Sequence, residues 1–341
     1  MSAGESDLLV KKPWRTNTEP SQGAPWGFLG EGEGSLLHYL ARDYYRGDGV
    51  IVDAGSFLGR SAWFFGTGLA SNPTLEATDA RVHCFDNFIV NDQLTTDAIR
   101  NAFGQDLPLG ASTRHLFDDA TRPVAKWLEV HEGDFHTYRW LARPIEILLV
   151  DIAKAGSLNR RLVESMFSCL IPGRSLVVQQ DYHHPWLPHV HTSMEVLSEY
   201  FELVEPKIDD SAVFLLTQSI PDESLRAAAA VHDLPFAMQL ALMDQALERL
   251  PEGSRCHVAL ARANLIGRGL GYDAMRGALG DIDRRYGPEA ADEHWRQYRA
   301  QMGAVLDELR SGLTRGWQFV HSGQVDDAMR IAESYEPNSD R

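Results

Sequence analysis

A short β-branched run followed at once by a glycine-containing turn is the feature that most constrains how this chain can fold. The run Val-Ile-Val at 50–52 precedes the turn Asp-Ala-Gly-Ser-Phe-Leu-Gly at 53–59. Such a run is typical of a parallel strand buried on both faces. The helix expected from Ser61 to Leu69 would offer unpaired amide groups at its first turn to an anionic ligand. The sequence therefore predicts the strand–turn–helix unit of a nucleotide-binding α/β domain.

Further strand-like runs alternate with helical segments along the first two thirds of the chain. Helical spacing of apolar residues predicts helices over 35–45, 61–69, 158–170 and 193–200. The strands are expected at 82–85, 128–131, 145–150, 175–178, 201–204 and 212–216. This alternation predicts an α/β fold with a doubly wound, mostly parallel, Rossmann-like sheet covered on both faces.

The composition changes after about residue 219, where alanine, leucine, arginine and glutamate dominate. The length of 341 residues suggests about two domains. We expect a mobile N-terminal arm at 1–25, an α/β domain at 26–218 with an inserted lid at 87–122, and a helical domain at 219–341. Helices are expected in the last part near 222–231, 235–250, 254–266, 272–285, 288–312 and 324–334.

Charge and composition exclude several classes of partner. The formal net charge of -16 repels phosphate backbones, so nucleic acid is not an expected partner. No window approaches the ~18 apolar residues of a membrane span, and the N-terminus lacks an apolar run like that of a signal peptide. The three cysteines are far apart, which fits a reducing compartment. We expect a cytoplasmic protein that acts on a small molecule.

The turn at 53–59 differs from a pyrophosphate-binding turn. A dinucleotide site favours GxGxxG, with neutral groups around two phosphates. Here Asp53 stands ahead of Gly55 and Gly59, and its charge suits a cofactor that carries an ammonium and a sulfonium. Asp86 closes the second strand, where a carboxylate can accept from ribose hydroxyls. The structural alternative is a turn whose glycines only permit tight packing, and a nicotinamide enzyme is the weaker rival.

Residues 28–218 resemble the class I S-adenosylmethionine-dependent methyltransferases. The run 53–61 is similar to the first motif of that family, Phe85-Asp86 is similar to the second, and 133–135 lies where these enzymes hold adenine. The resemblance implies S-adenosylmethionine as cofactor, with its methionine end at the glycine turn and its ribose on Asp86. The implied cofactor-binding residues are Asp53, Gly55, Ser56, Gly59, Ser61, Asp86 and Asp134.

Within that family, the far strand ends resemble the metal-dependent O-methyltransferases of the catechol and macrocin types. Asp151 follows the fourth strand and Gln180-Asp181 the fifth, so the resemblance implies a divalent metal, such as Mg²⁺, on Asp151, Gln180 and Asp181. Lys154 stands where the catechol-type enzymes have a lysine that helps to deprotonate the substrate. Two positions depart from the pattern, because Gln180 replaces an acid and Ala153 occupies the place of a second one.

Four histidines follow the fifth predicted strand within nine residues. They are His183, His184, His189 and His191. Ligands bind outside the carboxyl ends of the strands in such sheets, which puts this cluster near the expected site. His183 or His184 could replace the missing acid as the base, or one histidine could hold a softer metal with Asp151 and Asp181. The alternative is a set of hydrogen-bonded loop residues.

These features predict methyl transfer to an oxygen, or a nitrogen, of a small polar acceptor such as a sugar or a natural product. The expected catalytic residues are Asp151, Lys154, His183 and His184. Two alternatives stay open: a metal-dependent oxygenase or hydroxylase that uses the same fold, and a non-catalytic binding or assembly module. The helical C-terminal region is a candidate contact for a homodimer.

Overall fold

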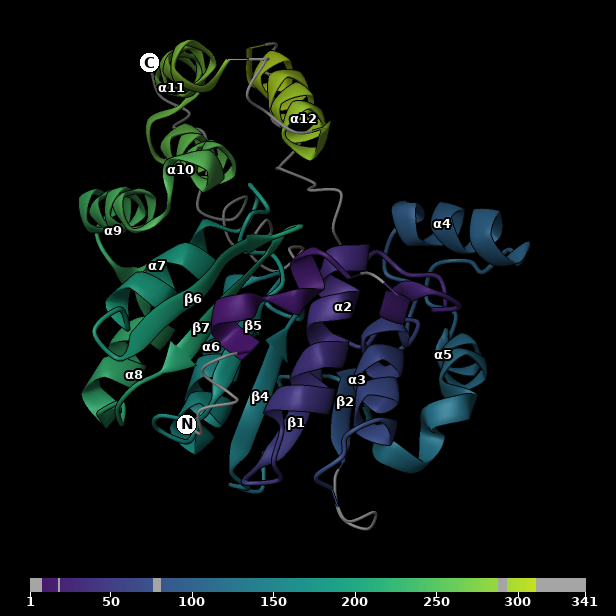
Figure 1. Ribbon diagram of the computed structural model, residues 1–341. Helices are drawn as coiled ribbons and strands as arrows, with labels where there is room; N and C mark the ends of the chain where they lie inside the picture. The colour runs from purple at the N-terminus through teal and green to yellow at the C-terminus, as the bar shows by residue number, and fades with distance from the viewer. Residues whose placement is uncertain (1–7, 18, 76–80, 288–292, 311–341) are drawn as a thin grey trace.

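A seven-stranded sheet forms the centre of the computed structural model, which describes residues 8–17, 19–75, 81–287 and 293–310 (Figure 1). The strand order is β3-β2-β1-β4-β5-β7-β6. Strands β1 to β5 run parallel, and β7 runs antiparallel to both of its neighbours. The predicted doubly wound, mostly parallel α/β fold is therefore confirmed. The strands are β1 (Val50–Ala54), β2 (Val82–Asp86), β3 (Leu128–Glu132), β4 (Ile145–Val150), β5 (Leu176–Gln179), β6 (Phe201–Ile208) and β7 (Ser211–Leu216).

Helices cover both faces of the sheet and extend beyond it. The α-helices are α2 (Glu31–Tyr39), α3 (Arg60–Ala70), α4 (Gln93–Phe103), α5 (Arg114–Thr121), α6 (Gly156–Met166), α7 (Pro188–Val196), α8 (Asp222–Ala229), α9 (Phe236–Arg249), α10 (Arg255–Leu270), α11 (Tyr272–Tyr286) and α12 (Glu293–Arg310). A π-helical turn, η3 (Leu40–Tyr44), continues α2. Short 3-10 segments are η1 (Pro13–Arg15), η2 (Glu19–Ser21), η4 (Arg122–Trp127), η5 (Phe167–Cys169), η6 (Val231–Asp233) and η7 (Glu252–Ser254).

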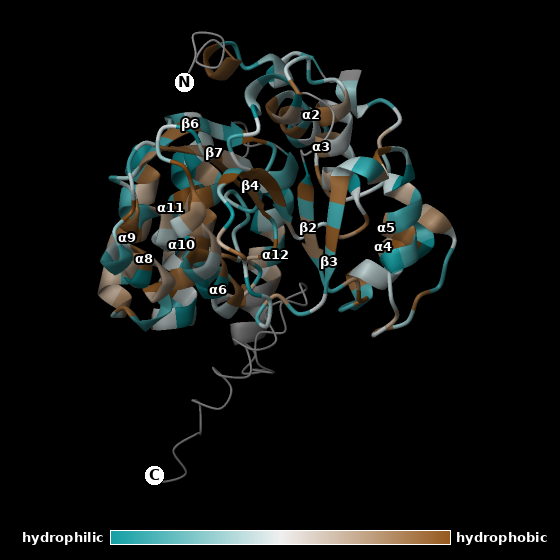
Figure 2. Ribbon diagram, turned by 90° about the horizontal axis from the view of Figure 1, so that it is seen from below, coloured by the Kyte–Doolittle hydropathy of each residue, from teal (hydrophilic) through white to brown (hydrophobic). Residues whose placement is uncertain are grey.

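Alternate residues of the central strands enter two separate cores. Ile147 and Leu149 of β4 pack with helices α2 and α3, whereas Leu148 and Val150 pack with α6 to α10. This is the period of two that a strand imposes on its side chains. Figure 2 shows hydrophobic colour along β4 and hydrophilic stretches on peripheral helices such as α5. The sheet is thus buried on both faces, as its apolar strands predict.

The described part of the N-terminal segment packs on the edge of the sheet. A mobile arm over residues 1–25 stays a prediction. The Trp14 side chain is 1% exposed, and its Nε1 donates to Glu205 Oε2 of β6 at 3.0 Å. Arg15 also pairs with Glu205. A buried tryptophan contributes more apolar surface than a polar composition suggests, and it holds this segment against β6.

The helical C-terminal region is present, although its first helices belong to the main core. Side chains of α8, α9 and α10, among them Leu225, Met243 and Val258, lie in the same cluster as β4 and β5. A second cluster joins α10, α11 and α12 to Trp186. The boundary near residue 219 stays a prediction, and the helix expected at 324–334 lies outside the described residues.

No helix within the described ranges is both long and apolar enough to cross a membrane.

A buried ion pair closes the amino-terminal end of the sheet. Glu146 of β4 is fully buried and accepts hydrogen bonds from the backbone amides of Arg46 at 2.7 Å and Gly47 at 3.0 Å. The Arg174 guanidinium donates to the same carboxylate and to the Tyr44 carbonyl oxygen. The carboxylate thus accepts the backbone hydrogen bonds of the turn that leads into β1. Its removal would leave the buried Arg174 side chain with the exposed Asp48 carboxylate, at 3.2 Å, in place of a buried charge partner.

We predict that Glu146→Ala lowers the free energy of unfolding by about 3–5 kcal/mol, because it removes the buried charge partner of Arg174 and the acceptor of the Arg46 and Gly47 amides. Urea denaturation measures this change. Arg284→Ala is the control, since its pair with Asp281 is exposed and contributes at most about 1 kcal/mol. Equal losses in the two variants would contradict the structural role of Glu146.

Candidate functional site

The carboxyl ends of β1 and β4 meet directly at the glycine turn. Gly55 has a φ of 109°, and a Cβ added there would lie 2.7 Å from the Asp151 carbonyl carbon. The Asp151 amide donates to the Ala54 carbonyl oxygen at 2.8 Å. The glycine is therefore required by contact between two protein segments. This contact joins the predicted cofactor turn to the predicted catalytic loop.

Asp53 is a fully buried carboxylate at the end of β1. Its Oδ2 accepts from Ser61 Oγ at 2.8 Å, and Ser56 Oγ donates to the Asp53 carbonyl oxygen at 3.1 Å. Its Oδ1 has no hydrogen-bond partner among the described residues. Burial raises the pKa of Asp53 to about 7, against the lowering effect of the two serines. A buried acceptor without a partner costs free energy unless a ligand supplies a donor.

Asp86 holds the glycine turn by its carboxylate. Oδ2 accepts from the Phe57 amide at 2.8 Å, and Oδ1 accepts from the Phe88 amide at 2.7 Å. Burial raises the pKa of Asp86, while these backbone hydrogen bonds lower it. Phe57 adopts a φ of 44°, a conformation that side chains rarely take and that the Asp86 contact secures. A carboxylate has about four lone-pair sites, so two amides leave room for further donors.

Gly59 begins helix α3 under the inserted segment. It has a φ of 89°, and an added Cβ would lie 2.6 Å from Thr121 Cγ2 of α5. Residues 87–122 contain α4 and α5, which agrees with the expected helical pieces. The Gly59 position therefore requires glycine for its conformation and for packing against α5.

An aromatic cover lies over the turn. The Phe28 and Phe57 rings stack at 5.5 Å, and Trp26 contacts Phe28 at 5.2 Å and Phe103 of α4 at 6.0 Å. Arg60 fixes the cover by donating to the Leu29 carbonyl oxygen at 2.9 Å. A cavity of about 500 Å³ lies between Trp26 and α4. Trp26 thus joins the cover to α4 of the inserted segment, and the cavity is lined by Trp26 and α4, with no residue of the turn among its lining residues.

Asp134 lies at the outer end of β3, next to Asp86. The Gly133 amide donates to the Asp86 carbonyl oxygen at 3.0 Å, which brings the ends of β2 and β3 together. The Asp134 side chain is exposed and accepts from the His136 amide and from His136 Nδ1, both at 2.9 Å. These hydrogen bonds lower its pKa. The residue is placed beside Asp86, and its role toward adenine stays a prediction.

A lysine bridges the carboxylates at the ends of β4 and β5. Lys154 Nζ donates to Asp151 Oδ1 at 2.6 Å and to Asp181 Oδ2 at 2.5 Å. Burial alone would lower the pKa of Lys154, but the two carboxylates raise it above its ordinary value. Burial raises the pKa of Asp151 to about 7; Lys154 opposes that rise and Asp181 adds to it. Lys154 therefore stays an ammonium, and Asp151 titrates near neutral pH.

Gln180 completes this group. With the amide orientation that satisfies its neighbours, its nitrogen donates to Asp151 Oδ1 at 2.9 Å and to Asp181 Oδ1 at 3.0 Å. An acid at this position would add a third negative charge. A neutral amide that donates to both carboxylates therefore suits this site better than the acid that the resembled family has at the position of Gln180.

The predicted magnesium ligands do not fit a metal as they stand. The Lys154 ammonium lies between Asp151 and Asp181 and already neutralises one of their two charges. The amide nitrogen of Gln180, a donor, faces both carboxylates. Magnesium requires oxygen ligands in near-octahedral geometry. The Asp151, Gln180 and Asp181 set is thus organised around a protein cation.

Three of the four clustered histidines bind backbone carbonyl oxygens through Nε2. The partners are Pro206 for His183 at 2.8 Å, Ala153 for His189 at 2.8 Å and Tyr182 for His191 at 2.6 Å. Burial lowers the pKa of all three imidazoles. His184 is buried with its ring 5.1 Å from that of Tyr298 in α12. The cluster thus matches the hydrogen-bonded alternative better than a set of bases.

The same region shows what sequence reasoning missed. Helix α7 begins at Pro188, not near 193, so His189 and His191 lie in a buried helix. Proline suits the first turn of a helix, where its missing amide donor is not needed. His189 supports the carbonyl of Ala153, which is buried at the position where an acid was expected. It is a positioning residue for the loop of Asp151 and Lys154.

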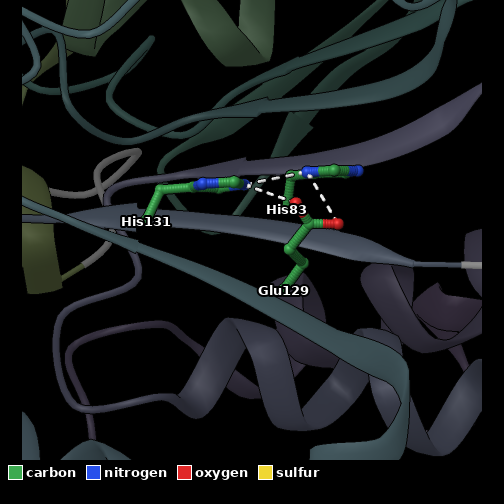
Figure 3. A group of neighbouring side chains, drawn as sticks. All are labelled: His83, Glu129 and His131. Carbon is green, nitrogen blue, oxygen red and sulfur yellow. Dashed lines mark hydrogen bonds and ion pairs between the residues drawn. The ribbon is translucent and has the colours of Figure 1, made fainter.

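Within the described ranges, one group of histidine and acidic side chains is close enough to share a metal ion, and it lies elsewhere. It consists of His83, Glu129 and His131 (Figure 3). No described histidine joins Asp151 and Asp181 in such a group. The oxygenase alternative therefore lacks its expected ligand set.

Comparisons with models of known protein families and with curated proteins gave no match. Among solved structures, the chain is similar to CalS11, a TDP-rhamnose 3'-O-methyltransferase of calicheamicin biosynthesis, with 16% identity over 63% of this chain and 95% of that chain and a TM-score of 0.39. It is also similar to human N-acetylserotonin methyltransferase, with 14% identity over 64% of this chain and 67% of that chain and a TM-score of 0.28. A third similar structure is the [4+2]-cyclase SpnF, with 12% identity over 89% of this chain and 90% of that chain and a TM-score of 0.30. Such low similarity carries no argument about activity.

We predict that Gly55→Ala destabilises the protein by about 2–5 kcal/mol, because a strained φ and a backbone clash act together. Gly173→Ala is the matched control, since Gly173 has a φ of 71° but open space around its Cβ position. Only the conformational cost, about 1 kcal/mol, is expected there. Thermal unfolding of both variants measures the difference. Equal shifts in the two variants would show that close contact between β1 and the Asp151 loop does not require a glycine at position 55.

Proposed function

We propose that this chain binds S-adenosylmethionine at the turn 53–59 and transfers its methyl group to an oxygen of a small polar acceptor. The observation that carries the proposal is the close contact between Gly55 and Asp151. It puts the Asp151–Lys154–Asp181 group beside the turn that would hold the cofactor. Methyl transfer needs mainly alignment of an acceptor and removal of its proton. A carboxylate with a pKa near neutrality suits that task.

The residues of the turn fit this cofactor. Asp53 Oδ1 is a buried acceptor without a partner among the described residues, and it suits the ammonium of the methionine end. The first turn of α3 offers backbone amides to the cofactor carboxylate. Asp86 retains acceptor capacity for ribose hydroxyls while it holds Phe57 and Phe88. When bound, the cofactor would supply an electrophilic methyl group on a sulfonium sulfur.

On the acceptor side, Asp151 takes the base role. Its carboxylate accepts the proton of the acceptor hydroxyl as that oxygen becomes nucleophilic. The Lys154 ammonium holds Asp151 and Asp181 in place and offers a third hydrogen to the acceptor oxygen. Gln180 donates to Asp151 Oδ1, the oxygen that Lys154 also contacts, and to Asp181 Oδ1. His183 and His184 have no step in this mechanism, because the neutral His183 ring is held by a backbone carbonyl and His184 packs on Tyr298.

The charge balance of the group favours a cationic reactant. When Asp151 is deprotonated, two carboxylates and one ammonium leave a net charge of about −1 in a partly buried site, where charges interact more strongly than in water. A sulfonium gains from that charge, whereas a pyrophosphate is repelled by it. The acceptor identity and a homodimer through the C-terminal helices stay predictions.

Calorimetric titration tests the cofactor directly. We expect S-adenosylmethionine and its demethylated product to bind with a stoichiometry of one, and NAD⁺ to give no binding heat, because Asp53 repels a pyrophosphate. Binding of NAD⁺ but not of S-adenosylmethionine would support the dinucleotide rival. Binding without methyl transfer to any acceptor in a broad screen would support the non-catalytic module.

The second test is the pH dependence of methyl transfer. Asp151 acts in its deprotonated form, so kcat/KM should rise with pH through about 7, the raised pKa of this carboxyl, and then level off. Asp151→Asn should lower kcat at least about 100-fold, the contribution of a general base. Asp119→Asn, an exposed change on α5, is the control. A rate that is independent of pH across this range would remove Asp151 from the base role.

A further inference from the structure

The edge strand β3 and its neighbour β2 bring a histidine pair and a carboxylate to one face of the sheet. Strands β2 and β3 pair in parallel, with His83 opposite Glu129 and Phe85 opposite His131. Because alternate residues of a strand share a face, His83, Glu129 and His131 project to the same side (Figure 3). This side is opposite the face that α3 covers. The group lies outside the Asp151–Lys154–Asp181 site.

The ligand atoms of these three side chains converge. His83 Nδ1 lies 2.9 Å from His131 Nε2. Glu129 Oε2 lies 3.8 Å from His83 Nδ1, and Glu129 Oε1 lies 3.8 Å from His131 Nε2. All three ligand atoms lie within 4.8 Å of one another. Ligand atoms about 2.0–2.1 Å from a tetrahedral zinc ion stand roughly 3.3 Å apart. The observed separations bracket that value, so small side-chain movements would suffice.

We infer that His83, Glu129 and His131 bind a divalent ion of the zinc class. Two imidazole nitrogens and one carboxylate form a ligand set typical of zinc sites that keep one open position. Imidazole disfavours magnesium and calcium, which take oxygen ligands. The His83 side chain is 3% exposed and that of Glu129 is 48% exposed, so the group opens to solvent on one side. Water can therefore supply the remaining ligand.

Neighbouring side chains hold both rings in place. The His83 and His131 rings are parallel within 3°, Phe85 stacks on His131 at 4.5 Å, and the Trp140 ring meets His83 at 5.3 Å. The Tyr138 hydroxyl contacts His131 Nδ1 at 3.2 Å. Partners that fix the second ring nitrogen orient a metal-binding histidine and raise its affinity. The site is thus rigid on the histidine side and adjustable at Glu129.

The protons of the metal-free group can be assigned. Arg143 can only donate, so His83 Nε2 accepts from it at 3.2 Å, and His83 Nδ1 carries the proton toward His131 Nε2. Metal binding needs the Nδ1 lone pair, so this proton moves to Nε2 and Arg143, which is half-exposed, turns away. The tautomer changes and no proton is released. Burial lowers the pKa of His83 to about 4 and also lowers that of His131, which keeps both rings neutral.

Calorimetric titration of zinc into the metal-free full chain tests this inference. We expect the wild type to bind one zinc ion that Glu129→Gln weakens at least tenfold and His131→Ala abolishes. Glu129→Gln is nearly isosteric and largely exposed, so it preserves the fold. His115→Ala is the control, because His115 is an exposed histidine on α5 that contacts Gln105. Circular dichroism of each variant checks folding.

Cobalt absorption gives a second, independent measurement. A Co²⁺ ion held by two imidazoles and a carboxylate should give visible bands that Glu129→Gln and His131→Ala remove and His115→Ala retains. Two results would overturn the inference: no zinc binding to the wild type, or binding with equal affinity in all variants. The first would leave the group as a hydrogen-bonded chain. Because neither measurement uses methyl transfer, a failure here does not touch the proposed function.

Discussion

The bridge from Lys154 to Asp151 and Asp181 is the interaction on which the candidate site depends. It joins the ends of β4 and β5, at hydrogen-bond distances of 2.6 and 2.5 Å, around a cation that the chain itself provides. Two carboxylates so close together would otherwise need an ion or an extra proton. The ammonium meets that need, and its single charge leaves the group negative. The same arrangement explains why an amide is accommodated at Gln180 and why Asp151 titrates near neutrality.

Contact between Gly55 and the Asp151 loop gives the bridge its place in the molecule. The absence of a Cβ at Gly55 lets β1 and β4 end within van der Waals contact, and Asp86 fixes the far side of the turn through Phe57. His189 supports the loop through the Ala153 carbonyl oxygen. The candidate cofactor turn and the Asp151–Lys154–Asp181 group are thus held by the Gly55 contact and by two side chains that bond to the backbone. Such preorganisation is what an alignment-limited reaction needs.

Much of the fold could be predicted because its strands are short, apolar and regularly separated by helices. The turn at 53–59 and the strand-end acids Asp86, Asp151 and Asp181 also follow from sequence, since strand ends meet at one edge of a parallel sheet. The partners of those side chains could not be predicted. Lys154 bridges two loops that lie 27 residues apart, and His189 turns inward because α7 begins at Pro188. His83 and His131 meet only through the register of β2 and β3, which no local pattern encodes.

Calorimetric titration of magnesium into the wild type and into Lys154→Met is the sharpest test of whether Lys154 takes the place of a metal. The substitution keeps the side-chain stem and removes the charge, so Asp151 and Asp181 face each other without a cation. We predict that Lys154→Met binds magnesium, that the added change Asp181→Asn abolishes this binding, and that the wild type binds none at this site. Binding in the wild type that Lys154→Met weakens would contradict this prediction, because the ammonium would then not compete with the metal.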